Sequence, residues 1–176
     1  MSTLLDLHTQ RLKLVPILPT SLRLSNTDLS RHLAAEVPDI WPPEHWEPHV
    51  FDFFDQHYLE SPHSIAWNRY LIVRSPTPVV VGAMGGFPKT ANEVEIGYSL
   101  LEPWQRQGLA TEALDAILKE IFADSRVHSI CAQTFPHLLP SIRILQKCGF
   151  QHVGDGEEEG SVLYRLHRDT SPASDS

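Results

Sequence analysis

The sequence predicts an α/β protein of the α+β type, with a mixed, mostly antiparallel sheet and helices on both of its faces. The length of 176 residues suits one compact domain. Strand-like and helix-like segments follow the order β-α-α-β-β-β-α-β-α-β-β. Three consecutive strands indicate an antiparallel meander, and the later β-α-β alternation indicates a parallel step. We therefore expect about six to seven strands in a single domain over residues 1–168, followed by a flexible tail at 169–176.

The first half of the chain supplies one strand and two helices. Residues 11–15 alternate in polarity and stop at a proline, which predicts a strand. Leucines at helical spacing predict a helix over residues 20–37. Residues 41–46 are too rich in proline for regular structure. Aromatic residues at helical spacing predict a second helix over residues 50–59.

The second half holds the remaining strands. Two β-rich runs flank a proline-containing turn and predict a hairpin, and a third strand precedes a strongly amphipathic helix. A further strand, a short helix and two last strands follow. In order, these elements are expected at 70–73, 79–84, 93–101, 108–122 (helix), 127–134, 141–147 (helix, ended by Gly149), 150–153 and 161–167.

The charge balance argues against several classes of partner. Lys+Arg number 14 against 22 Asp+Glu, which gives a net charge of -8, and the basic residues form no run. Such a chain is a poor match for nucleic acid or an anionic membrane. Residues 1–11 lack the features of a secretory signal, and the most apolar window, 71–87, is interrupted by Arg74 and two prolines. We therefore expect a cytoplasmic protein that binds neither nucleic acid nor membrane.

The loop before the 108–122 helix is the most informative segment. Residues 105–110 read Gln-Arg-Gln-Gly-Leu-Ala and lead from a strand into this helix. A helix N-terminus carries unpaired N–H groups and partial positive charge, so it suits a phosphate. The small residues Gly108 and Ala110 let the backbone approach an anion, and Arg106 adds charge. The alternative is a strand–turn–helix junction that only packs.

Five motifs together carry a family resemblance. The loop at 105–110 resembles the pyrophosphate-binding signature of the GNAT superfamily, the acyl-CoA-dependent N-acetyltransferases. Thr9-Gln-Arg-Leu-Lys-Leu resembles the opening strand of its ribosomal-protein alanine N-acetyltransferase (RimJ/RimL-like) branch, and Glu95-Ile-Gly-Tyr98 resembles the fourth strand. Ala110-Thr-Glu-Ala113 resembles that branch's helix start, and residues 141–150 resemble its last helix with the Gly-Phe that follows.

This resemblance implies a GNAT fold that binds acetyl-CoA where the fourth and fifth strands splay apart. The pyrophosphate would lie on the loop backbone at Arg106, Gln107, Gly108, Leu109 and Ala110, with Thr111 at the helix start. The pantetheine arm would pair with the backbone near Ser99, Leu100 and Leu101. A backbone N–H near Leu100 would hold the thioester oxygen as negative charge builds on it.

Glu95 is the first candidate for a general base. Acyl transfer needs a neutral amine nucleophile, so a group that takes the amine proton helps, either directly or through a water. Strand alternation places Glu93, Glu95 and Ser99 on one face, and the resemblance implies an acidic residue at this strand position in several members. Glu93 is the reserve candidate. The alternative role for Glu95 is a structural contact to a loop or a neighbouring strand.

Ser141 is the candidate acid that would protonate the departing thiolate. Many members of the superfamily carry a tyrosine four residues after the position that Ser141 matches, but Leu145 stands there in this chain. They also commonly carry an asparagine where this chain has Leu138, beside His137. The alternative role for Ser141 is helix capping or a hydrogen bond to pantetheine.

Aromatic residues in the first half predict the wall of an acceptor pocket. Trp41 and Trp46 flank two prolines and are expected to line this pocket, with core packing as the alternative. The ten histidines show no metal-binding spacing, so no metal is expected. Cys131 and Cys148 are expected to be small buried side chains rather than nucleophiles.

The predicted function is transfer of the acetyl group of acetyl-CoA to a primary amine by direct attack in a ternary complex. The acceptor would be either a protein N-terminal amine or a small-molecule amine, because a fold analogy supplies the reaction class and not the acceptor. A catalytically inactive CoA-binding sensor or regulatory module is the alternative. The sequence is compatible with either a monomer or a homodimer.

Overall fold

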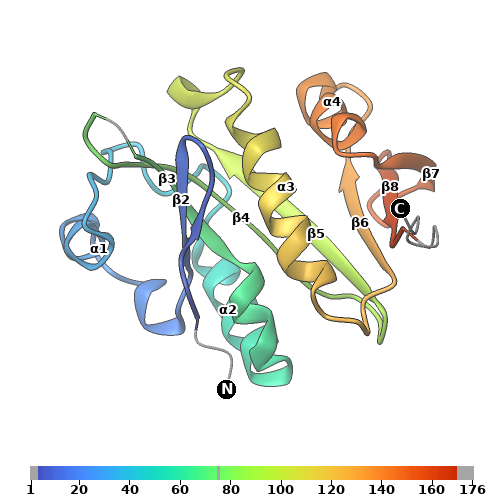
Figure 1. The fold of residues 1–176 in the computed structure, drawn as a ribbon, viewed down its shortest axis with the longest axis horizontal. Helices are drawn as coiled ribbons and strands as arrows, with labels where there is room; N and C mark the ends of the chain where they lie inside the picture. The colour runs from blue at the N-terminus through green and yellow to red at the C-terminus, as the bar shows by residue number, and fades with distance from the viewer. Residues whose placement is uncertain (1–3, 75, 170–176) are drawn as a thin grey trace, which may run out of the picture.

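A computed structural model describes residues 4–74 and 76–169, which form an eight-stranded sheet with the order β1-β2-β3-β4-β5-β6-β8-β7 (Figure 1). Its strands are β1 (Leu7–His8), β2 (Leu12–Pro16), β3 (Arg69–Val73), β4 (Val79–Pro88), β5 (Glu93–Leu100), β6 (Ser129–Thr134), β7 (Gln151–Asp155) and β8 (Val162–His167). Apart from Asp169, the tail expected at 169–176 lies outside the described residues.

The sheet is mixed and mostly antiparallel, as predicted. Among the described strands, β5 and β6 form the parallel pair, and the other neighbours are antiparallel. The strand count exceeds the expected number because Leu7–His8 pairs with β2, and a two-residue strand is too short to show a periodic pattern. Strand β4 also continues beyond residue 84, because Gly85 and Gly86 keep their pairing with β5 despite their low strand propensity.

The described residues contain four α-helices, α1 (Asn26–Leu33), α2 (Pro48–Glu60), α3 (Leu109–Phe122) and α4 (Leu139–Lys147). The helix expected over 20–37 is shorter than predicted. The Ser25 hydroxyl caps its start by accepting a hydrogen bond of 3.1 Å from the Asp28 amide, and Ala34 ends it in the left-handed conformation with φ 51°. None of the helices in the described ranges has the length and hydropathy needed to cross a bilayer.

The two faces of the sheet bury separate hydrophobic clusters. On one face, Leu71 and Val81 pack with the apolar side of α3, which lies across the sheet in Figure 1. On the other face, Tyr70 and Val80 pack with residues of α1 and α2, including Phe54. Successive side chains of a strand point to opposite faces. This alternation confirms that helices cover both faces.

Strands β5 and β6 diverge after three residues. Their pairing joins Glu93, Val94 and Glu95 of β5 to residues 129–131 of β6 and goes no further. The remainder of β5 stays paired with β4, from Gly86 to Gly82. The predicted splay is therefore confirmed, and Glu95 lies at the point where the two strands separate.

Candidate active site

The loop that precedes α3 is shaped by two residues in the left-handed conformation. Gly108 has φ 78° and occupies the N-cap position of α3, and Arg106 has φ 64°. Glycine adopts this conformation without steric cost, whereas a side chain is strained there. An added Cβ on Gly108 would also lie 3.3 Å from the Arg11 guanidinium. The conformation of the loop therefore favours glycine at position 108, and a larger side chain there would also press on Arg11.

The first turn of α3 presents backbone N–H groups to the loop. The first intrahelical bond is donated by the Glu112 amide to the Gly108 carbonyl, at 3.1 Å. The amides of Leu109, Ala110 and Thr111 precede that bond, so they have no helical carbonyl to pair with. Leu109 and Ala110 point their side chains into the core. This end of α3 therefore offers a small, electropositive surface of backbone.

Arg11 binds the backbone of this loop. Its guanidinium donates a hydrogen bond of 2.7 Å to the Gln107 carbonyl and lies 3.5 Å from the Glu112 carboxylate. Gln107 is also tied through its own side chain to the Pro103 carbonyl, at 3.1 Å. The motif that contains Arg11 is visible in the sequence, but its contact with a loop 96 residues away is a product of the fold.

Beyond Glu95, the backbone N–H and C=O groups of successive β5 residues point alternately toward β4 and away from it. The Leu101 amide donates to the Val81 carbonyl at 2.8 Å, so the Leu101 and Ser99 backbones point to β4. The Leu100 backbone points the other way, and its carbonyl accepts a hydrogen bond of 2.9 Å from Gln105. Of the three residues expected to pair with pantetheine, Leu100 alone turns its backbone away from β4. Ser99 and Leu101 flank it in the sequence and direct their backbone groups to β4.

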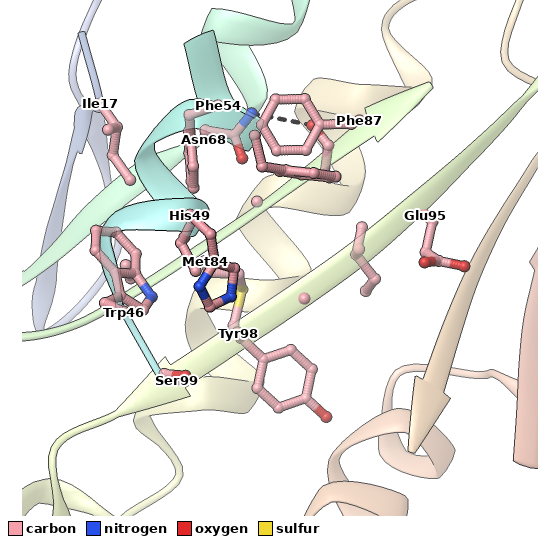
Figure 2. Close-up of a pocket in the computed structure, with 17 residues that line it drawn as sticks. Ile17, Trp46, His49, Phe54, Asn68, Met84, Phe87, Glu95, Tyr98 and Ser99 are labelled. Carbon is pink, nitrogen blue, oxygen red and sulfur yellow. Dashed lines mark hydrogen bonds between the residues drawn. The ribbon is translucent and has the colours of Figure 1, made fainter. Parts of the chain in front are cut away.

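Glu95 brings a carboxylate to the edge of a cavity. Its Oε2 accepts hydrogen bonds from Lys89 Nζ at 2.7 Å and from Gln133 Nε2 at 2.8 Å. The side chain is 37% exposed. Figure 2 shows its carboxylate pointing away from the aromatic side chains of the cavity and toward β6. A partly solvated carboxylate with fixed geometry can accept a proton.

Lys89 links Glu95 to the loop between β7 and β8. Its ammonium lies 2.8 Å from the Glu157 carboxylate, and the Glu157 amide donates to Gln133 at 2.6 Å. Burial opposes the charge on Lys89, but the hydrogen bonds to Glu157 and Glu95 outweigh it and raise its pKa. Lys89 is therefore a fixed cation that orients the Glu95 carboxylate.

Glu93, the reserve candidate for the base, is engaged in an ion pair. Arg165 donates to both of its carboxylate oxygens, at 2.6 and 3.2 Å, and Ser129 donates at 2.7 Å. The hydrogen bonds from Arg165 hold the pKa of Glu93 below its usual value, against the opposing effect of burial. This geometry suits a structural carboxylate more than a proton acceptor.

Ser141 lies in the first turn of α4, where it contacts Tyr98, a residue that the sequence alone does not assign to the site. The Tyr98 hydroxyl lies 3.0 Å from Ser141 Oγ and 3.2 Å from the Ser141 carbonyl. Burial raises the pKa of Tyr98, while the hydrogen bond to Ser141 acts in the opposite direction. The signal for Tyr98 was its place in the Glu95-Ile-Gly-Tyr98 motif.

A cavity of about 420 Å³ lies between β4, β5 and the start of α2. Figure 2 shows Trp46, Phe54 and Phe87 on one side of it and Tyr98 on the other. Trp41 has a different position from the one expected. It is buried behind Trp46, with the two ring centroids 5.5 Å apart, so it packs in the core instead of forming the wall.

The cysteines are poorly suited to nucleophilic catalysis. Burial, together with the charges of Glu93 and Glu95, raises the pKa of Cys131 to about 12. Burial likewise raises the pKa of Cys148 to about 12. A thiol with such a pKa is protonated at neutral pH and is a weak nucleophile. Within residues 4–74 and 76–169, no group of three or more His, Cys, Asp or Glu side chains is arranged to hold a metal ion.

The arrangement supports a transfer between two ligands. The start of α3 leaves three backbone amides without helical partners, β6 leaves β5 after Glu95, and the cavity that Glu95 lines borders β5. Comparison with known structures shows that the fold is shared with acetyltransferases. An acetyltransferase from Agrobacterium tumefaciens superimposes with a TM-score of 0.66 at 17% identity, over 96% of this chain and 97% of that one. A ribosomal L7/L12 α-N-protein acetyltransferase in complex with coenzyme A gives a TM-score of 0.62 at 13% identity, over 90% and 95%.

Sequence comparison identifies the family. The chain is 36% identical over 79 residues to the ribosomal protein uS5-alanine N-acetyltransferase of Escherichia coli, which is 40% of this chain and 41% of that protein. The matches to the first curated relatives span between 35% and 41% of their length. The model of the Acetyltransferase (GNAT) domain matches residues 12–151, which is most of the chain. The chain therefore belongs to the GNAT acetyltransferase family.

Proposed function

We propose that this protein transfers the acetyl group of acetyl-CoA to a primary amine by direct attack within a ternary complex. The observation that carries the proposal is the position of Glu95. Its carboxylate stands where β5 and β6 separate, and the residue lines the cavity. The base and the two ligand sites that the reaction needs would therefore meet at one point of the sheet.

The loop and the first turn of α3 fit the pyrophosphate of acetyl-CoA. Gly108 keeps this surface free of side chains, and the amides of Leu109, Ala110 and Thr111 have no partner within the helix. Arg106 adds a positive charge, and Leu100 turns its backbone toward the splay. When bound, acetyl-CoA supplies an acetyl group activated as a thioester.

Glu95 would take the proton of the acceptor amine. Free amines have pKa values of about 8 for α-amino groups and about 10.4 for lysine-like groups, so they are mostly protonated at neutral pH. The contacts of Glu95 with described residues use Oε2, which leaves Oε1 to hold the amine or a bridging water. Lys89 and Gln133 keep the carboxylate oriented while the proton moves.

Ser141 and Tyr98 would supply the proton that the leaving thiolate takes. When Tyr98 donates to Ser141 Oγ, the Ser141 hydroxyl proton is free to point toward the splay. The raised pKa of Tyr98 keeps its phenol protonated at neutral pH. In this assignment the Tyr98–Ser141 pair replaces the tyrosine that is missing at position 145.

The acceptor is a protein N-terminal amine or a small-molecule amine. The relative that acts on ribosomal protein uS5 supports the first, and a cavity of about 420 Å³ supports the second. The alternative to the enzyme is a CoA-binding sensor or regulatory module without catalysis. Acetyl transfer to an amine distinguishes the enzyme from the sensor, since both would bind CoA.

Glu95→Gln tests this function. We expect kcat to fall about 100-fold or more, the usual contribution of a general base, while calorimetry shows unchanged affinity for acetyl-CoA. Glu157→Gln is the matched control, because it also removes a carboxylate bound to Lys89 but leaves Glu95 in place. Full activity in Glu95→Gln would remove Glu95 from the mechanism. A wild-type protein that binds CoA but acetylates none of a broad panel of amines would favour the sensor.

A further inference from the structure

The cavity has a rigid aromatic wall. Phe87 of β4 packs edge to face against Phe53 and Phe54 of α2, with ring centroids 5.2 Å apart in both pairs. Trp46 continues the wall, 5.7 Å from Phe54. Rings that interlock in this way hold their positions and offer flat apolar surface to a ligand. The wall is therefore formed before any ligand binds.

The floor of the cavity is open because of Gly97. This residue lies between Glu95 and Ser99 on the same face of β5 and pairs with Gly85 of β4. A Cβ added at Gly97 would meet no atom within 4 Å, whereas one added at Gly85 would collide with Asn68. The space over Gly97 is therefore part of the cavity and is not filled by other side chains. It is the natural place for the body of an acceptor.

The cavity offers recognition for one positive charge only. Of the residues that line it in the described part of the chain, Glu95 is the one carboxylate, and the other titratable side chains are His49 and Tyr98. The ammonium of Lys89 already lies 2.7 Å from that carboxylate. It would repel any further positive charge of a ligand that carries more than one amine. A polyamine would therefore leave its distal ammonium groups without a partner against apolar surface.

We propose that the acceptor is a small primary amine that carries one bulky apolar group, of the arylalkylamine type. This inference rests on the proposed acetyl transfer. The amine lies at Glu95, and the apolar group lies over Gly97 against the wall of Trp46, Phe53, Phe54 and Phe87. A cavity of about 420 Å³ is large enough for such a molecule.

A comparison of acceptors tests the substrate class with the full-length protein. Release of free thiol from acetyl-CoA is measured with 2-phenylethylamine, methylamine, spermidine and a synthetic peptide that begins with alanine. We expect kcat/KM for 2-phenylethylamine to exceed that of every other amine about tenfold or more, the effect of filling an apolar pocket. A preference for spermidine or for the peptide would overturn this inference and leave acetyl transfer standing. Bound acetyl-CoA with no acetylated amine would instead overturn the proposed function.

Gly97→Val locates the apolar group. Valine suits a strand, and a Cβ at this position meets no atom within 4 Å, so the melting temperature and the KM for acetyl-CoA are expected to stay unchanged. The KM for 2-phenylethylamine is expected to rise about tenfold, while that for methylamine changes less than about twofold. Equal effects on the two amines, or none on either, would contradict the assignment of the floor.

Phe53→Ala probes the opposite wall with a matched control. Phe53 is 47% exposed, so its removal disturbs the core little. We expect the KM for 2-phenylethylamine to rise several-fold and that for methylamine to stay the same. Leu59→Ala removes another exposed apolar side chain of α2, 84% exposed and outside the cavity lining, and should change neither. An unchanged KM in Phe53→Ala would contradict the role of the wall.

Discussion

The two halves of β5 have opposite characters. In the first half, residues 93–95 pair with β6, residues 94 and 95 also pair with β4, and the acidic side chains are held by Arg165 and Lys89. In the second half, residues 97–100 pair with β4, while β6 has diverged. The first half is a closed, ion-paired part of the sheet, and the second half borders the cavity and the splay. Glu95 stands at the boundary between them.

This difference assigns separate tasks to neighbouring residues. Glu93 and Glu95 differ by two positions on the same face of one strand, yet Glu93 is held on both oxygens and Glu95 on one. A carboxylate that is fully engaged stabilises the fold, and one with a free oxygen can accept a proton. The boundary between the halves therefore favours Glu95 over Glu93 as the proposed base.

The largest effect on stability is expected from breaking the closed half. Glu93→Gln removes the charge that Arg165 binds through two hydrogen bonds, and the Glu93 side chain is only 11% exposed. We expect the free energy of unfolding to fall by about 2 kcal/mol, the size of a charged hydrogen bond in a partly buried site. Denaturant unfolding measures it. Glu44→Gln, an exposed carboxylate, is the control and should change little. Equal stability of both variants would contradict the structural role of Glu93.

The ion pair between Glu93 and Arg165 also predicts a pH dependence of stability. The pKa of Glu93 is lower in the folded protein than its ordinary value of 4.5, so this group stabilises the fold above pH 4.5. The contribution is lost as the pH falls through the folded pKa. We expect the stability difference between wild type and Glu93→Gln to be constant near neutral pH and to shrink below about pH 4. A difference that does not change with pH would remove the ion pair as its cause.

A smaller effect, confined to catalysis, is expected in the open half. Tyr98→Phe removes the hydroxyl that contacts Ser141 and leaves the ring in its packing. We expect kcat to fall about tenfold, equivalent to about 1.4 kcal/mol, with an unchanged KM for acetyl-CoA. Tyr164→Phe is the matched control, because it also removes a tyrosine hydroxyl, but from a residue of β8 that lies beside His152 and outside the cavity lining. If both variants lost activity equally, Tyr98 would have no specific role in proton transfer.

The sequence predicted the parts of the fold and the site that depend on local pattern. The loop at 105–110 is contiguous, and strand alternation places Glu95 on one face without knowledge of other strands. The splay was expected from the family resemblance. The two-residue β1 escaped prediction because such a strand carries no periodicity.

Contacts between distant segments escaped prediction for a different reason. Tyr98 and Ser141 are 43 residues apart, and Gln133 reaches Glu95 across 38 residues. The packing of α4 brings Ser141 to Tyr98, and the course of β6 beside β5 brings Gln133 to Glu95. Trp41 and Trp46 look equivalent in the sequence, but one is buried in the core and the other lines the cavity. Burial depends on the whole packing of α2 against the sheet, which local pattern does not encode.

Calorimetric titration of acetyl-CoA into the wild type and into Gly108→Glu tests the central claim most directly. Gly108→Ala is measured beside them, because it carries the same backbone strain at φ 78° without the added charge. We predict saturable binding to the wild type, weaker binding to Gly108→Ala, and a loss of about 100-fold or more in Gly108→Glu, whose carboxylate would repel the pyrophosphate. No binding to the wild type, or equal binding to all three proteins, would contradict an acetyl-CoA site at the start of α3.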